Sequence, residues 1–276
     1  MNHLELFSGT HSFGKVSKKY DYRSVSLDRD IGGTCPLKSG YKSDKHYKED
    51  IMTWDYKQYP VGHFKLITAS PVCLWWSALR ACWVGRKLKA HGNTIITHEI
   101  LQQDIDNFGK PMVDKVIEII EYFKPKHYII ENPRGSKMKH YIAEKYPKYN
   151  EKYNDFSYCK FSDWGYQKDT RFWTNISGLE NCLCKKDCGN MITIKTQDGA
   201  KHTGYGTPIK SATRTLHKSP IGDAKKAVNK SSKLHKINMG SWGKSGTEQS
   251  GIGCGNNRLE RYRIPELLID YMLKHI

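Results

Sequence analysis

Long apolar runs are missing from this sequence. No stretch approaches the roughly 20 apolar residues that a membrane-spanning helix needs, and nothing after Met1 resembles the apolar core of a signal peptide. There is no internal repeat, and the eight cysteines are irregularly spaced. These absences argue against a membrane protein, a repeat protein and a secreted disulfide scaffold. They predict a cytoplasmic protein with reduced thiols.

Acidic residues are scarce relative to basic ones. The 276 residues include 45 lysines and arginines against 28 aspartates and glutamates, which gives a formal charge of +17. A charge of this size indicates a polyanionic partner, and nucleic acid is the usual candidate. The length suits one large α/β domain with a small appended region, and such a chain can bury a core without disulfides.

Two apolar stretches end in residues that carry chemistry. Phe64–Ala69 reads as a strand that stops at Ser70-Pro71, and Cys73 follows at once. His127–Glu131 reads as a second strand that ends in Glu-Asn-Pro-Arg134. Helical periodicity between the two predicts a crossover helix and therefore a parallel sheet. Because ligands bind beyond the carboxyl ends of such strands, we expect Cys73 and Glu131 to act on one substrate ring.

A glycine turn near the start of the chain indicates a nucleoside cofactor. The strand Leu4–Phe7 leads into Ser8–Gly14, where a helix is expected to begin near Ser12. Asp28 closes the next strand, about 20 positions after the turn, where a ribose hydroxyl acceptor usually stands. Asp50 could approach the adenine of such a cofactor, although a solvated loop acid would look the same. A lone glycine turn is also often only a turn.

A thiolate and a carboxylic acid at adjacent strand ends suit chemistry on a cytosine ring. The thiolate adds to ring carbon 6, and the acid at ring nitrogen 3 stabilises the developing negative charge. Carbon 5 then becomes nucleophilic enough to attack a sulfonium methyl group. From these residues alone, Cys73 as a buried structural thiol and Glu131 as a turn-capping acid remain open.

Four motifs in a fixed order carry a family resemblance. They are Phe7-Ser-Gly-Thr-x-Ser-Phe-Gly, Ser70-Pro-x-Cys, Glu131-Asn-Pro-Arg, and Gly165-x-Gln followed by Arg171-Phe-Trp-Thr-Asn. Over residues 3–175 the chain resembles the DNA cytosine-5 methyltransferase family, in particular the small forms carried by phages and large viruses. If the source is a virus, the compartment would be the host-cell cytoplasm.

The resemblance implies a Rossmann-like α/β domain over residues 1–175 that binds S-adenosylmethionine. The cofactor residues that it implies are Phe7, Ser8, Gly9, Thr10, Asp28 for the ribose and Asp50 for the adenine. The catalytic residues that it implies are Cys73 as nucleophile, Glu131 as the cytosine-binding acid and Arg171 near the target nucleotide. The substrate would be a cytosine flipped out of double-stranded DNA. We expect a monomer with no membrane partner.

The remainder of the chain reads as two further parts. Residues 176–255 contain 13 lysines and arginines against 5 acids, show little periodicity, and stand where the family keeps its target-recognition region. Residues 256–276 predict a helix that packs back on the catalytic domain, with Leu267, Leu268, Tyr271 and Met272 on its apolar face. Before these parts, Phe156–Phe161 and Arg171–Thr174 predict two strands at the sheet edge.

The sequence departs from the family pattern at three positions. His11 replaces a second glycine and could crowd the cofactor, Val72 replaces a proline, and Asp169 stands where an arginine is usual. Two alternatives therefore stay open: a catalytically weak DNA-binding relative, and an RNA (tRNA) cytosine-5 methyltransferase, which charge cannot distinguish from a DNA enzyme.

A cysteine-rich stretch raises the question of a metal. Cys182, Cys184 and Cys188, with His202 downstream, could supply four zinc ligands. Their spacing does not match a standard zinc knuckle, and an incidental cluster of reduced cysteines explains them equally well. The sequence therefore assigns no metal.

Overall fold

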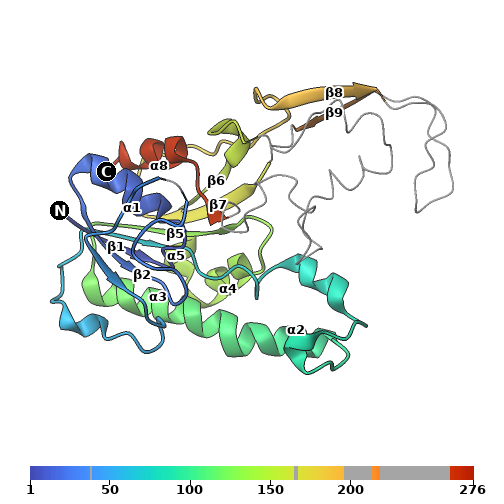
Figure 1. The fold of residues 1–276 in the computed structure, drawn as a ribbon, viewed down its shortest axis with the longest axis horizontal. Coiled ribbons are helices and arrows are strands. Elements are labelled where there is room, and N and C mark those ends of the chain that lie inside the picture. Colours follow the sequence, from blue (N-terminus) through green and yellow to red (C-terminus); the bar gives the residue numbers. More distant parts are fainter. Residues whose placement is uncertain (38, 165–166, 196–212, 218–261) are drawn as a thin grey trace. The chain divides into compact units, whose positions relative to one another are not determined.

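The computed structural model describes residues 1–37, 39–164, 167–195, 213–217 and 262–276 (Figure 1). The chain divides into two compact units. The first comprises Met1–Phe156, Asp169–Asn181 and Ile264–Ile276, and the second comprises Ser157–Lys168 and Cys182–Arg263. Most of the target-recognition region predicted over 176–255 lies outside the described residues, and so does the predicted metal candidate His202.

The first unit is built on a seven-stranded sheet with the order β3-β2-β1-β4-β5-β7-β6. The strands are β1 Asn2–Leu6, β2 Arg23–Leu27, β3 Lys45–Tyr47, β4 Leu66–Ala69, β5 His127–Pro133, β6 Tyr153–Ser157 and β7 Asp169–Thr174. The five strands β3, β2, β1, β4 and β5 are parallel, and β7 runs antiparallel to β5. This is the predicted parallel α/β sheet, in the order of the S-adenosylmethionine-dependent methyltransferase fold. The first of the two late strands begins three residues earlier than predicted.

Helices cover both faces of the sheet. The α-helices are α1 Ser12–Ser17, α2 His98–Asp104, α3 Lys110–Phe123, α4 Met138–Lys145, α5 Pro147–Asn150 and α8 Glu266–Leu273. Short 3-10 helices lie at Lys18–Tyr20, Tyr56–Gln58, Ala78–Trp83, Lys89–His91 and Tyr158–Lys160. Figure 1 shows α1 and α8 on one face of the sheet and α3 and α4 on the other. None of the helices in the described ranges is long and apolar enough to cross a membrane.

The central strands are buried on both faces. All four residues of β4 are buried, as are Leu4 and Leu6 of β1 and Ile129 and Ile130 of β5. This burial explains why β4 and the first part of β5 read as apolar and β-branched runs rather than alternating ones. The buried side of α3 packs on the sheet with its apolar residues at helical spacing, as the crossover prediction requires. The core therefore holds the strand ends at fixed positions.

A π-helical turn directly precedes the crossover helix α3. Ile105–Gly109 joins α2 directly to α3, so the helical run is continuous from His98 to Phe123. A Cβ atom at Gly109 would stand 3.0 Å from the indole ring of Trp76, so a side chain there would require the ring to shift by a few tenths of an ångström. Such π-turns often lie near functional sites, and Trp76 follows the Cys73 turn.

The C-terminal helix α8 packs against α1. The Tyr20 hydroxyl donates to the Asp270 carboxylate at 2.7 Å, and the Ile264 amide donates to Ser12 Oγ at 3.1 Å. The predicted apolar face is wrong in part, because the Leu267 side chain is 66% exposed whereas Ile269 is fully buried. The helix begins only at Glu266, and its docking turns Leu268, Ile269 and Met272 inward.

The described part of the second unit contains one pair of strands. β8 Met191–Lys195 and β9 Thr213–His217 are antiparallel, with Thr193 opposite Thr215. Ahead of β8, the loop Cys182–Asn190 is bonded to the segment Ser157–Ser162 through backbone and side-chain hydrogen bonds. Cysteines in both segments approach one another there.

Candidate active site

Three of the predicted site residues, Phe7, Asp28 and Glu131, directly follow one row of the sheet. The paired residues of this row, across β2, β1, β4 and β5, are Leu27, Leu6, Ala69 and Ile130. The next residues along the four strands are Asp28, Phe7, Ser70 and Glu131. Parallel strands end at a common edge, so the register brings cofactor candidates and catalytic candidates to the same edge of the sheet.

The turn that precedes Cys73 is bonded to the end of β5. The Asn132 side-chain amide is fully buried and donates to the Pro71 carbonyl at 2.9 Å. Cys73 is partly exposed, and Glu131 is 7% exposed. The sequence motif Glu-Asn-Pro-Arg contains Asn132, but nothing local to the sequence indicates that its amide reaches the other motif. This bond links the turn that carries the candidate nucleophile to the strand that carries the candidate acid, since β5 continues two residues beyond the predicted end at Glu131.

Arg171 is held by a carboxylate that the sequence analysis missed. Its guanidinium donates to the two Asp155 carboxylate oxygens at 2.8 and 2.9 Å, and it lies 3.6 Å from the centre of the Tyr153 ring. Arg134 Nε donates to the same carboxylate at 3.0 Å. Burial alone would raise the pKa of Asp155, but Arg171 and then Arg134 outweigh burial and lower it. One buried anion therefore orients both arginines.

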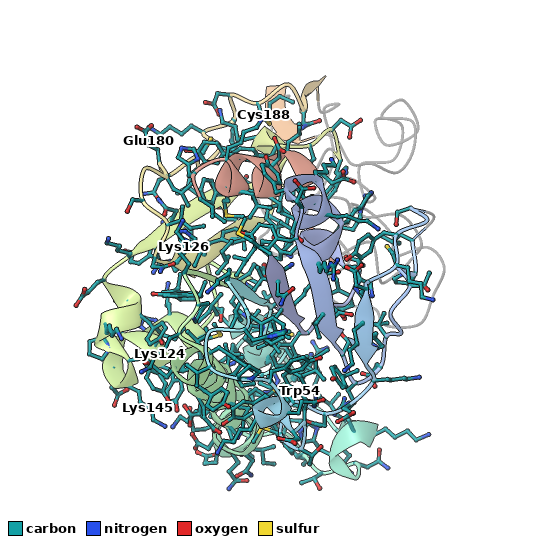
Figure 2. The ribbon with its side chains drawn as sticks, turned by 90° about the vertical axis from the view of Figure 1, so that its left-hand side faces the viewer. Trp54, Lys124, Lys126, Lys145, Glu180 and Cys188 are labelled. Atoms are coloured by element: carbon teal, nitrogen blue, oxygen red, sulfur yellow. The ribbon has the colours of Figure 1, made fainter. Side chains whose placement is uncertain are left out.

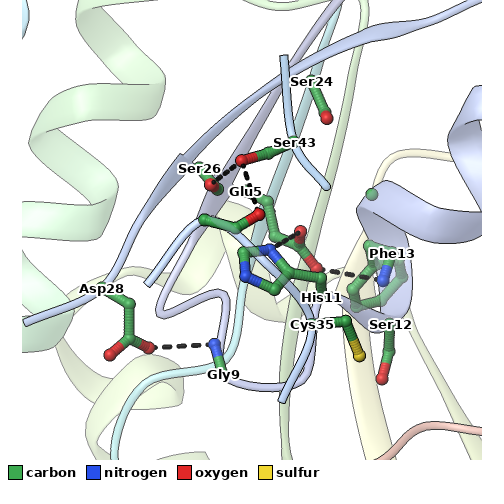
Figure 3. Close-up of polar contacts among 12 residues, drawn as sticks. Glu5, Gly9, His11, Ser12, Phe13, Ser24, Ser26, Asp28, Cys35 and Ser43 are labelled. Carbon is green, nitrogen blue, oxygen red and sulfur yellow. Dashed lines mark hydrogen bonds and ion pairs between the residues drawn. The ribbon is translucent and has the colours of Figure 1, made fainter. Parts of the chain in front are cut away.

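The glycine turn has an unusual backbone. Phe7, Gly9 and His11 have φ angles of 56°, 48° and 54°, all in the left-handed region that disfavours side chains. Asp28 supports this turn, because its Oδ2 accepts from the Gly9 amide at 2.9 Å (Figure 3). Its Oδ1 accepts from the amides of Asp30 and Ile31, each at 2.9 Å. The carboxylate thus joins two loops at the cofactor edge.

The His11 ring lies inside the protein. The side chain is fully buried, and its Nε2 is 2.8 Å from the Gly32 carbonyl. Its Nδ1 is 3.7 Å from Glu5 Oε2 (Figure 3). Glu5 Oε1 also accepts from the Phe13 amide at the start of α1. Burial would lower the pKa of His11, but the Glu5 carboxylate and the Gly32 carbonyl outweigh burial and raise it. The ring occupies a polar cluster beneath the turn.

The remaining cofactor candidates have different surroundings. The Thr10 hydroxyl is 3.0 Å from Ser12 Oγ, and the Asp50 carboxylate accepts from the Met52 amide at 2.9 Å and lies 3.6 Å from Arg29. The Ser8 residue is 4% exposed, and its hydroxyl has no hydrogen-bond partner among the described residues. An unsatisfied buried hydroxyl in the turn fits a polar ligand there. Bound S-adenosylmethionine would be such a ligand.

A cavity of about 560 Å³ lies beside the Cys73 turn. It is lined in part by Trp75, Arg80, Gln102 and Lys137. Arg80 is 3% exposed and paired with Asp104. Its guanidinium therefore stabilises the packing of the 3-10 helix Ala78–Trp83 against α2.

Exposed lysines are also found at the opposite end of the strands. Lys124 ends α3 and Lys126 directly precedes β5, and Figure 2 shows both with Lys145 on the outer surface. The basic excess is therefore not confined to the edge that carries the site. Among the predicted metal candidates, Cys184 and Cys188 approach each other and Cys159, whereas Cys182 is outside that group.

Comparison with known proteins gave one curated relative. A protein of Frog virus 3 (isolate Goorha), described as a probable DNA (cytosine-5)-methyltransferase, is 36% identical over 195 residues, which are 69% of this chain and 79% of that protein. No family model matches the sequence.

Solved structures give weaker matches. A protein encoded in an E. coli prophage, described as a putative DNA modification methyltransferase, is 14% identical, with a TM-score of 0.39, over 63% of this chain and 46% of that one. A DNMT2 variant from Spodoptera frugiperda is also 14% identical, with a TM-score of 0.40, over 68% of this chain and 56% of that one. The chain thus spans about half the length of these two proteins.

Proposed function

We propose a mechanism that proceeds from one fact: this chain belongs to the DNA (cytosine-5)-methyltransferase family. In this mechanism the chain transfers a methyl group from S-adenosylmethionine to carbon 5 of a cytosine in DNA, through a covalent adduct with Cys73. The observation that supports it most is the bond from Asn132 to Pro71, which ties the turn before Cys73 to the strand end of Glu131.

The cofactor would lie along the turn at the ends of β1 and β2. The residues that would hold it are Phe7, Ser8, Gly9, Thr10, Asp28 and Asp50. When bound there, S-adenosylmethionine supplies an electrophilic methyl group on a sulfonium centre. The unsatisfied Ser8 hydroxyl and the carboxylate that braces the Gly9 amide are the features of this chain that favour such a site.

Cys73 and Glu131 would carry the chemistry on the base. The Cys73 thiolate attacks carbon 6 of the ring and forms a carbon–sulfur bond, while Glu131 donates a proton or a hydrogen bond to nitrogen 3. The electron pair displaced from the double bond would make carbon 5 nucleophilic enough to accept the methyl group that the bound cofactor supplies, with S-adenosylhomocysteine as the leaving group. Loss of the proton from carbon 5 then re-forms the double bond and expels the thiolate of Cys73.

Arg171 would contact the target nucleotide, and Asp155 would position it. Two hydrogen bonds to a buried carboxylate restrict the guanidinium to one orientation, so less side-chain entropy is lost when the base arrives. Arg134, bonded to the same carboxylate, stands three residues after Glu131. We therefore assign Asp155 a positioning role rather than a catalytic one.

The substrate would be duplex DNA with the target cytosine flipped out of the stack. The net charge of +17 supports phosphate binding, and we propose that residues 176–255 choose the sequence. Incubation of the purified chain with labelled S-adenosylmethionine tests the function, with duplex DNA and tRNA as separate substrates. We expect label on cytosine of the DNA, whereas label on tRNA alone, or on neither, would contradict the proposal.

A further inference from the structure

Three cysteine thiols in the second unit converge on one point. Cys159, in the 3-10 helix Tyr158–Lys160, lies with Cys184 and Cys188 of the following loop, and all three sulfur atoms are within 4.8 Å of one another. We propose that these three cysteines bind a structural zinc ion. The proposal does not depend on the methyl-transfer mechanism, because none of the three residues belongs to the candidate active site.

The separation of the sulfur atoms fits a metal centre. Zinc binds thiolates at about 2.3 Å in a tetrahedron, which places neighbouring sulfurs about 3.8 Å apart. Sulfurs within 4.8 Å of one another therefore need to move by about 1 Å or less to reach this arrangement. Three thiolates are soft ligands that favour zinc over magnesium or calcium. No fourth histidine, cysteine or carboxylate of the described residues joins the group, so one coordination position remains for a further ligand.

Contacts that do not involve sulfur hold the two segments together. The Cys184 amide donates to Ser157 Oγ at 2.9 Å, and the Ser157 amide donates to the Cys182 carbonyl at 2.9 Å. The Asn190 side chain is buried, and its amide donates to the Cys159 carbonyl at 2.9 Å. Hydrogen bonds on both sides of the cysteines thus fix the backbone, so their convergence belongs to the fold of this unit.

The charges around the cluster favour thiolate ligands. Lys160 Nζ lies 2.8 Å from Asp187 Oδ2, and the exposed Lys185 and Lys186 are part of the same loop. Three thiolates with one zinc ion carry a net charge of −1, which these lysines can balance.

Sequence spacing alone leads to a different set of ligands. Cys182, Cys184 and Cys188 stand close together in the sequence, whereas Cys159 precedes them by more than twenty residues in a stretch that reads as a strand. In the structure Cys182 is outside the group and Cys159 is inside it. A bound zinc ion would thus join the segment before β7 to the loop that leads directly into β8.

Metal analysis of the purified full-length chain tests the proposal. We expect stoichiometric zinc in the unaltered chain, retained by Cys182→Ser and by the exposed Cys82→Ser, and lost from Cys159→Ser and Cys184→Ser. Cys182→Ser is the matched control, since it removes a thiol from the same loop. Zinc lost from Cys182→Ser but kept by Cys159→Ser would overturn the assignment, as would unaltered protein without stoichiometric metal.

A second measurement covers the case in which the serine variants do not fold. The unaltered chain, stripped of metal and then titrated with cobalt(II) under reducing conditions, should develop the intense near-ultraviolet absorption of cobalt–thiolate bonds. Zinc should remove this absorption at one equivalent. A chain that shows no such band would contradict the zinc site, as would a chain in which two of the three cysteines form a disulfide and which binds no metal after reduction.

Discussion

The two halves of the candidate site are held in place by different means. On the cofactor half, left-handed backbone at Phe7, Gly9 and His11 shapes the turn, and Asp28 braces it through backbone amides. On the base half, side chains make the links, with Asn132 bonded to Pro71 and Asp155 to the arginines. On the cofactor half, His11 can therefore stand where the family usually has a glycine, because its ring is accommodated in the interior. On the second half, the loss of one polar group breaks a long-range connection.

Apart from replacement of the nucleophile Cys73, Glu131→Gln should cause the largest loss of methyl transfer among substitutions that keep the base half folded. The neutral amide cannot deliver a proton to ring nitrogen 3, so methyl transfer should fall roughly 10²- to 10⁴-fold. Steady-state assays with duplex DNA would measure this fall, with circular dichroism to confirm folding. Glu144→Gln, on the exposed side of α4, is the control and should transfer methyl groups at the original rate. Equal rates for the two variants would remove Glu131 from the chemistry.

Asp155→Asn should weaken both activity and stability. The change leaves two arginines beside a neutral group, and loss of one partner of a buried pair costs about 3–5 kcal/mol of folding stability. Because Arg171 would no longer be held in one orientation, we also expect methyl transfer to be roughly 10- to 100-fold slower. Urea unfolding and kcat/KM measured together would check both effects. Asp106→Asn breaks an exposed pair with Lys110 and should cost less than about 1 kcal/mol.

The pKa of Asp155 also gives this variant a pH signature. Because the folded-state pKa is lowered, the carboxylate stabilises the native state above its unfolded pKa, and this contribution is lost as pH falls through the folded value. The unaltered chain should therefore lose more stability than Asp155→Asn on acidification below about pH 4. Parallel loss in both chains would mean that Asp155 is not held as an anion.

His11→Gly should have the smallest effect on function. Glycine relieves left-handed strain of about 1 kcal/mol, but it empties a buried position and leaves Glu5 without its neighbour, so a net loss of about 1–2 kcal/mol is expected. Because the ring points into the interior, S-adenosylmethionine affinity should change less than tenfold by calorimetry. A gain far above tenfold would show that His11 obstructs the cofactor.

The sequence was most informative where local pattern decides structure. Apolar and β-branched runs that stop near a proline predicted β4 and β5. The acid that follows β2 was predicted as the cofactor candidate Asp28. The links made by Asn132 and Asp155 could not be predicted, because each joins segments that no periodicity relates. The face of α8 was wrong at Leu267 for a similar reason, since docking on α1 rather than the apolar pattern alone fixes its rotation.

Covalent trapping tests the central claim most directly. Duplex DNA carrying 5-fluorocytosine should capture the chain in a complex that resists denaturation and requires S-adenosylmethionine, because fluorine cannot leave carbon 5 as a proton does. Cys73→Ser should form no such complex while it still binds DNA, since a hydroxyl is a much poorer nucleophile near neutral pH. Cys82→Ser should be trapped like the unaltered chain. If Cys73→Ser is trapped, or methylates DNA at the original rate, Cys73 is not the nucleophile.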